Sequence, residues 1–115
     1  MDGSHTIKKC YEITDKVQQC VMNQLRVHNV CFEGMILKPN MVTKGFDNPS
    51  ENNPEEVAYY TVKALSKNLP SSVPGVAFLS GGQPEEQASV NLNAINQMPK
   101  HTAPWNLSFS YGRAL

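Results

Sequence analysis

Apolar residues in the first part of the chain recur at intervals of three and four positions, which is the spacing of an amphipathic helix. They stand at Ile7, Cys10, Tyr11, Ile13, Val17, Cys20, Val21 and Leu25. This pattern predicts a helix from Ile7 to Leu25. A polar segment rich in Asn, Gly and Pro, between Asn40 and Asn53, instead predicts a loop.

Three short apolar runs predict β-strands. Val30 to Leu37 is mostly apolar and partly β-branched, although Glu33-Gly34 interrupts it, and such runs are typical of a strand buried on both faces. Val76 to Leu79 is uniformly apolar and too short for a helix. Trp105 to Tyr111 alternates between apolar and polar residues, as a third strand would.

Two further helices are predicted between these strands. Asn53 suits the N-cap of the first, Pro54 its first turn and Glu56 the capping-box position. Its inward face would carry Val57, Ala58, Thr61, Val62 and Leu65, with Pro70 beyond its end. The second opens at Pro84-Glu85-Glu86 and would turn Ala88, Leu92 and Ile95 inward, with Pro99 beyond its end.

The elements therefore alternate between helix and strand. Strands separated by helices pair in parallel through right-handed crossovers, so the fold class is α/β, with helices expected over both faces of the sheet. Ligands of parallel α/β folds bind at the carboxyl ends of the strands. The segments that follow the three strands should share that rim, and each contains polar, glycine or cationic residues.

Composition narrows the class of protein. A chain of 115 residues suits a single domain, 1–115, and 40% hydrophobic with 17% charged residues is typical of globular proteins. Ten basic and ten acidic residues cancel, which argues against nucleic-acid and membrane partners. The three cysteines lack zinc-site spacing and favour free thiols in a reducing compartment. The amino end lacks a signal-peptide pattern, so we expect a cytoplasmic protein.

Lys38 is the first candidate for chemistry. It follows the apolar end of a predicted strand and precedes Pro39. If its side chain is desolvated there, its pKa falls and the neutral amine becomes a nucleophile able to form a Schiff base with a ketone. An ordinary solvated surface lysine is the alternative, and residue chemistry alone leaves both open. Glu33, five residues earlier, is better interpreted as structural.

Each strand meets the segment that follows it at a junction. Lys38 belongs to the first junction, and the other two junctions predict an anion site. Ser80, Gly81 and Gly82 lie between a strand and a helix start, where glycine amides and the helix dipole attract phosphate, although the same residues also make a plain turn. Ser110, Gly112 and Arg113 combine a hydroxyl, a flexible backbone and a permanent cation, although Arg113 could equally be a surface residue. The three histidines show no metal-ligand spacing.

Several segments together resemble class I fructose-bisphosphate aldolases. Phe32-Glu33-Gly34-Met35-Ile36-Leu37-Lys38-Pro39-Asn40-Met41-Val42-Thr43 is similar to the Schiff-base signature of that family. Similar blocks follow in the same order, at Phe78 to Gln83, Asn91 to Asn96 and Phe109 to Leu115. The resemblance thus extends over nearly the whole chain.

The resemblance implies a partial (β/α)₈ barrel that corresponds to strands six to eight, with Lys38 on strand six. It implies that Lys38 forms an imine with fructose 1,6-bisphosphate and cleaves it reversibly to dihydroxyacetone phosphate and glyceraldehyde 3-phosphate. It also implies substrate or phosphate contacts at Ser80, Gly81, Gly82, Ser110, Gly112 and Arg113. No metal or other cofactor is implied, and the family is usually tetrameric.

The resemblance departs from the family pattern at both ends. The acid-base residues that the family carries on earlier strands, and its carboxyl-terminal tail, have no counterpart in these 115 residues. Three strands also leave an unclosed sheet. We therefore keep an alternative to the aldolase, a truncated non-catalytic fragment that binds sugar phosphates or protein partners.

Overall fold

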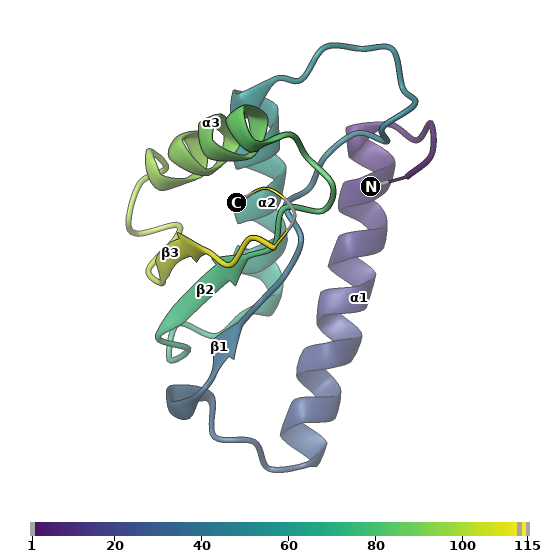
Figure 1. Ribbon diagram of the computed structural model, residues 1–115. Coiled ribbons are helices and arrows are strands. Elements are labelled where there is room, and N and C mark those ends of the chain that lie inside the picture. Colours follow the sequence, from purple (N-terminus) through teal and green to yellow (C-terminus); the bar gives the residue numbers. More distant parts are fainter. Residues whose placement is uncertain (1, 113, 115) are drawn as a thin grey trace.

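The computed structural model describes residues 2–112 and 114. Figure 1 shows the order of its elements along the chain. They are α1 (Ile7–Val27), a 3₁₀ turn (Phe32–Gly34), β1 (Ile36–Leu37), α2 (Pro54–Asn68), β2 (Gly75–Phe78), α3 (Glu85–Asn96) and β3 (Asn106–Phe109). The predicted alternation of helices and strands is confirmed.

The helices begin where local signals place their caps. The Thr6 side chain accepts a hydrogen bond from the Lys9 amide and caps α1. The Asn53 side chain accepts from the amides of Glu55 and Glu56, with Pro54 in the first turn of α2, so this predicted helix start is confirmed. Each cap satisfies main-chain donors that have no partner within the helix itself.

The three strands form one parallel sheet in the order β1-β2-β3. Ile36 pairs with Gly75 and Leu37 with Val76, while Gly75 to Phe78 pair with Asn106 to Phe109. Parallel pairing was predicted from the intervening helices and is confirmed. The third strand is shorter than the expected Trp105 to Tyr111, and Trp105 instead lies in the core, where its indole donates to the Pro70 carbonyl.

The prediction of a long first strand buried on both faces was wrong. Phe32–Gly34 forms a 3₁₀ turn, so only Ile36 and Leu37 pair with β2. Ile36 is 68% exposed, whereas Leu37 packs against the core. Alternate strand residues project to opposite faces. One face of β1 is therefore covered and the other is open.

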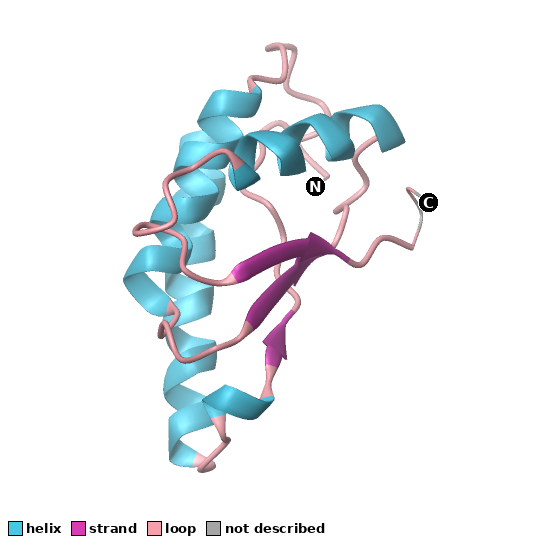
Figure 2. Cartoon of the chain, turned by 90° about the vertical axis from the view of Figure 1, so that its left-hand side faces the viewer, coloured by secondary structure: helices cyan, strands magenta, loops and turns pink. Residues whose placement is uncertain are grey.

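The helices lie on one side of the sheet, which Figure 2 shows from the side. The core there is built mainly from α2, the strands and the segments between them. Its largest fully buried side chains include Phe78, Met41, Leu65 and Ile95. Helices on both faces were expected, and this expectation was wrong, because α1 packs on α2 rather than on the opposite side of the sheet.

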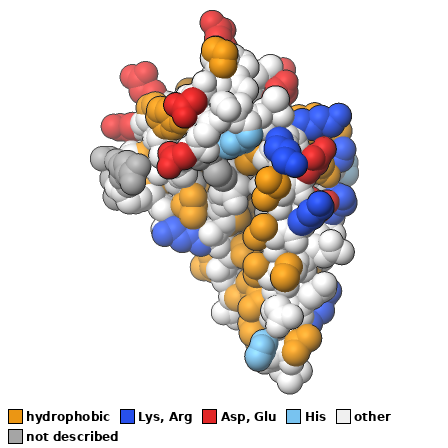
Figure 3. All heavy atoms as spheres, turned by 90° about the vertical axis from the view of Figure 1, so that its right-hand side faces the viewer, with side chains coloured by type: hydrophobic (Ala, Val, Ile, Leu, Met, Phe, Trp, Pro, Cys, Tyr) orange, Lys and Arg blue, Asp and Glu red, His pale blue; other side chains and the backbone are white. Residues whose placement is uncertain are grey.

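The outer side of α1 carries a stripe of apolar side chains that no other described element covers. Ile13, Val17 and Val21 are 51%, 54% and 41% exposed, and apolar side chains run down this face of the molecule in Figure 3. Cys10, Thr14 and Met22 are the buried positions of this helix. Among residues 2–112 and 114, no helix is long and apolar enough to cross a membrane.

Candidate functional site

The carboxyl ends of the three strands meet around one cavity of about 410 Å³. Its lining includes Lys38 from the first junction, Ser80, Gly81 and Gly82 from the second, and Ser110 and Gly112 from the third. Six of the seven residues singled out from the sequence are thus brought together. The seventh, Arg113, lies outside the described residues.

Main-chain hydrogen bonds continue past the strands and hold these junctions side by side. The Leu79 amide donates to the Pro39 carbonyl at 3.0 Å, and the Ser110 amide donates to the Phe78 carbonyl at 2.8 Å. The first bond joins the segment after β1 to that after β2, and the second joins β2 to the segment after β3. The rim of the cavity is therefore an extension of the sheet rather than three independent loops.

Lys38 lies two residues beyond Ile36, on the open side of the sheet. Side chains two positions apart on an extended segment share a face. Lys38 is exposed, as Ile36 is, so the desolvated environment expected from the sequence is not present around it in this chain. The expectation assumed a strand end covered on both sides, whereas helices cover only one side here.

Glu33 does not join this cavity. It belongs to the 3₁₀ turn that precedes β1, and its carboxylate accepts a hydrogen bond from the Cys31 thiol at 3.7 Å. Cys31 and Cys20 are exposed and Cys10 is buried, and all three are free thiols.

Ser80 to Gln83 form a tight turn at the rim. Gly81 and Gly82 have φ values of 63° and 87°, and the Gln83 amide donates to the Ser80 carbonyl at 3.1 Å. Two successive residues with positive φ are the pattern of a type I′ turn, which glycine adopts without strain. The glycine pair is therefore required by the conformation of the turn.

The third junction is anchored to α3. The Tyr111 hydroxyl donates to the main-chain carbonyl of Ala88 at 3.1 Å, and burial raises the pKa of the Tyr111 phenol. The rings of Tyr111 and Phe109 lie 5.0 Å apart between centroids. Tyr111 thus fixes the segment that carries Ser110 and Gly112, which flank it in sequence.

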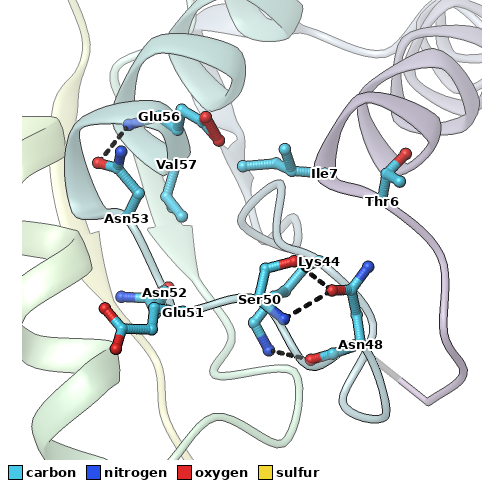
Figure 4. A pocket seen from close by; sticks show the side chains of 10 residues that line it. All are labelled: Thr6, Ile7, Lys44, Asn48, Ser50, Glu51, Asn52, Asn53, Glu56 and Val57. Atoms are coloured by element: carbon cyan, nitrogen blue, oxygen red, sulfur yellow. Dashed lines mark hydrogen bonds between the residues drawn. The ribbon is translucent and has the colours of Figure 1, made fainter.

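The long segment after Lys38 returns across the start of α1 before it enters α2. The amides of Gly45 and Asp47 donate to the carbonyls of His5 and Gly3. A small hollow of about 110 Å³ lies at this place, and Figure 4 shows the side chains that line it. Among them, the Lys44 ammonium donates to the Asn48 carbonyl. Because Glu51 and Glu56 also line it, the hollow is not suited to an anion.

Two parts of the site were not predicted from the sequence. Asp2 also lines the cavity, a position for which the sequence carries no local signal. Asn91 is completely buried on α3 and bonds to Gln83 of the rim turn. Its position between Ala88 and Ile95 on the inward stripe could have revealed it, since asparagine is rare in such places.

Comparisons with known proteins identify similar chains. The family model for class I fructose-bisphosphate aldolase matches residues 1–115. Fructose-bisphosphate aldolase B of Sparus aurata is 55% identical over 114 residues, which are 99% of this chain and 31% of that protein. The cytosolic fructose-bisphosphate aldolase 4 of Arabidopsis thaliana is 55% identical over 115 residues, which are 100% of this chain and 29% of that protein.

A solved structure shows the same arrangement of elements. The fructose-bisphosphate aldolase of Plasmodium falciparum, crystallised in a ternary complex with TRAP and a small molecule inhibitor, matches with a TM-score of 0.93 and 50% identity. The match covers 99% of this chain and 32% of that one. The chain therefore spans about a third of the length of these relatives.

Proposed function

This chain belongs to the class I fructose-bisphosphate aldolase family, and we propose that it carries the imine-forming part of the aldolase site, with Lys38 as the nucleophile. Its fold, three parallel strands with helices outside, is a partial (β/α)₈ barrel. The observation that supports the proposal best is the shared cavity, which Lys38 lines together with the glycine turn after β2 and the segment after β3. A glycine turn just before the start of a helix is a common phosphate site.

The proposed reaction begins with attack of the neutral Lys38 amine on the ketone carbon of fructose 1,6-bisphosphate. Loss of water then gives a protonated imine. When the bond between the third and fourth carbons breaks, its electron pair moves into that imine, which becomes an enamine, and glyceraldehyde 3-phosphate leaves. Protonation and hydrolysis of the enamine release dihydroxyacetone phosphate and restore the amine. This sequence requires no metal.

The polar residues of the cavity would bind the substrate. Ser80 and Ser110 would supply hydroxyl groups, Gly81, Gly82 and Gly112 would allow a phosphate to approach the main chain, and Arg113 would add a positive charge. A volume of about 410 Å³ lies within the range of small-molecule sites and is large enough for a sugar phosphate.

Full turnover also needs proton transfer. Cleavage requires a base for the hydroxyl on the fourth carbon, and the family resemblance assigns acid-base work to strands that precede this segment. Lys38 is exposed in this chain, without the desolvated surroundings that favour a nucleophilic amine. This observation favours a second candidate function, in which the chain binds sugar phosphates, or a protein partner, without completing cleavage.

Trapping with sodium borohydride separates these possibilities. With dihydroxyacetone phosphate and borohydride, we expect a stable secondary amine on Lys38, located by peptide mass spectrometry. Lys38→Arg should abolish the adduct because a guanidinium does not form the imine, while Lys100→Arg, at another exposed lysine, should leave it intact. An adduct with no cleavage of fructose 1,6-bisphosphate supports the second candidate, and no adduct at Lys38 contradicts the Schiff-base role.

Cellular location and assembly are proposed from the relatives and from the family resemblance. We propose a cytoplasmic protein, since the Arabidopsis relative is described as cytosolic. The tetramer expected from the family resemblance stays a prediction, which light scattering of the purified chain would test.

A further inference from the structure

We propose that Asn91 is a positioning residue for the rim turn formed by Ser80, Gly81, Gly82 and Gln83, acting through the Gln83 side chain. This inference rests on the proposed function, which gives that turn its role in phosphate binding. Neither Asn91 nor the Gln83 side chain lines the cavity around Lys38. Their contribution would therefore be indirect, through the shape of the turn.

Gln83 folds back on the turn through its side chain. Its main-chain amide and its side-chain Nε2 both donate to the Ser80 carbonyl, at 3.1 Å and 2.8 Å. The carbonyl is an acceptor only, so it fixes which end of the Gln83 amide faces it. Two donors on one oxygen hold the Ser80 peptide, and with it the Gly81 amide group, in a single orientation.

The Gln83 side chain also has a buried partner on α3. Since Nε2 faces Ser80, Oε1 points the other way, and it accepts a hydrogen bond from Asn91 Nδ2 at 2.6 Å. Gln83 is 8% exposed and Asn91 is 0% exposed. A buried acceptor without a partner is costly, so the Gln83 conformation depends on a donor at this position of α3.

Asn91 in turn connects the rim turn to the segment that follows Lys38. Asn52 Nδ2 donates to Asn91 Oδ1 at 2.9 Å, and Asn91 Nδ2 is 3.3 Å from Asn52 Oδ1. Asn52 directly precedes Asn53, the cap of α2. The chain of amides therefore joins the rim turn, α3 and the start of α2, which fixes the turn relative to two helices rather than to one.

The identity of residue 91 supports this role. α3 turns Ala88, Asn91 and Ile95 into the protein interior, and the other two are small or aliphatic. Asparagine is a poor helix former and an expensive residue to bury. A hydrophobic residue would serve packing at least as well, so the amide is explained by what it bonds rather than by the core.

Asn91→Asp tests the proposal with almost no change of shape. The aspartate presents a second acceptor to Gln83 Oε1 and removes the donor. Asn93→Asp makes the same chemical change on the exposed side of α3 and is the matched control. Asn52→Ala, at the less buried end of the network, replaces Asn91→Asp if that variant fails to fold by circular dichroism.

Hydrogen exchange read by mass spectrometry reports on the turn directly. We expect amides in a peptide covering Ser80 to Gln83 to exchange about tenfold faster in Asn91→Asp, the factor that loss of one buried hydrogen bond predicts. The Asn93→Asp chain should match the unsubstituted one. Unchanged exchange at the turn, or equal acceleration throughout the chain, would overturn the positioning role whether or not Lys38 forms an imine.

Borohydride trapping then distinguishes an effect on phosphate binding at the turn from an effect on the Lys38 amine. With dihydroxyacetone phosphate, we expect Asn91→Asp to need about tenfold more ketone for half-maximal labelling of Lys38. With dihydroxyacetone, which has no phosphate, labelling at a fixed concentration should change less than about twofold. Equal losses with both ketones would contradict a role specific to phosphate. If the unsubstituted chain forms no adduct, the proposed function fails, and hydrogen exchange alone decides the positioning role.

Discussion

The Ser110 amide, just after the last residue of β3, donates a hydrogen bond of 2.8 Å to the carbonyl of Phe78, the last residue of β2. Together with the bond from the Leu79 amide to the Pro39 carbonyl, it makes the cavity rim part of the sheet. The positions of Lys38, Ser80 and Ser110 therefore depend on strand register. Substitutions that leave the register intact should leave these three residues at the rim.

Gly81→Ala should destabilise the chain by about 1–2 kcal/mol, because the φ of 63° places a Cβ in the left-handed region. The ideal Cβ would meet only Leu79 Cδ1 at 3.7 Å, so backbone strain rather than a clash is the cause. Gly112→Ala has no neighbour within 4 Å and should be close to neutral. Urea unfolding of both variants measures the difference, and equal values would contradict it.

Met22→Ala should cost about 2–4 kcal/mol, since Met22 is 3% exposed and belongs to the core between α1 and α2. Val17→Ala lies on the apolar stripe and is 54% exposed, so its effect should stay within about 0.5 kcal/mol. Thermal and urea unfolding would compare the two. A larger loss at Val17 would mean that this stripe packs against something in solution.

Tyr111→Phe should remove about 1 kcal/mol of stability at neutral pH by deleting the hydrogen bond to Ala88. Burial raises the pKa of Tyr111 in the folded chain. The stabilisation is therefore complete below the unfolded pKa of about 10 and is lost as the pH rises through the higher folded value. Unfolding curves across alkaline pH should show the difference between the two chains shrinking.

Asp15 gives the opposite dependence on pH. Hydrogen bonds from Lys67 and then Asn68 lower its pKa, and the ion pair with Lys67 measures 2.8 Å. Its contribution is present above the unfolded pKa of about 3.9 and disappears as the pH falls through the folded value. Asp15→Asn should lose this acid-dependent part of the stability. The effect should be small and weaken with added salt, because the pair lies at the surface.

Local signals in the sequence were sufficient for much of the fold. Asn53 and Pro54 start α2 as predicted because a cap is satisfied within one turn of chain. The order of elements predicted parallel pairing, and that pairing alone brought Lys38, Ser80 and Ser110 to one rim. For these features, residue type and the order of elements determine the structure, through short-range hydrogen bonds and right-handed crossover connections.

Only the tertiary structure decided which side chains are buried, because that depends on which elements pack over them. Apolar spacing marked one face of α1, but α1 packs only against α2 among the described elements, so Met22 is buried and Val17 is not. The exposure of Lys38 follows in the same way from the open side of the sheet. Burial depends on neighbours that are distant in sequence. The same holds for buried polar side chains, since the hydrogen-bond partners of Asn91 are Gln83 and Asn52, which lie 8 and 39 residues away.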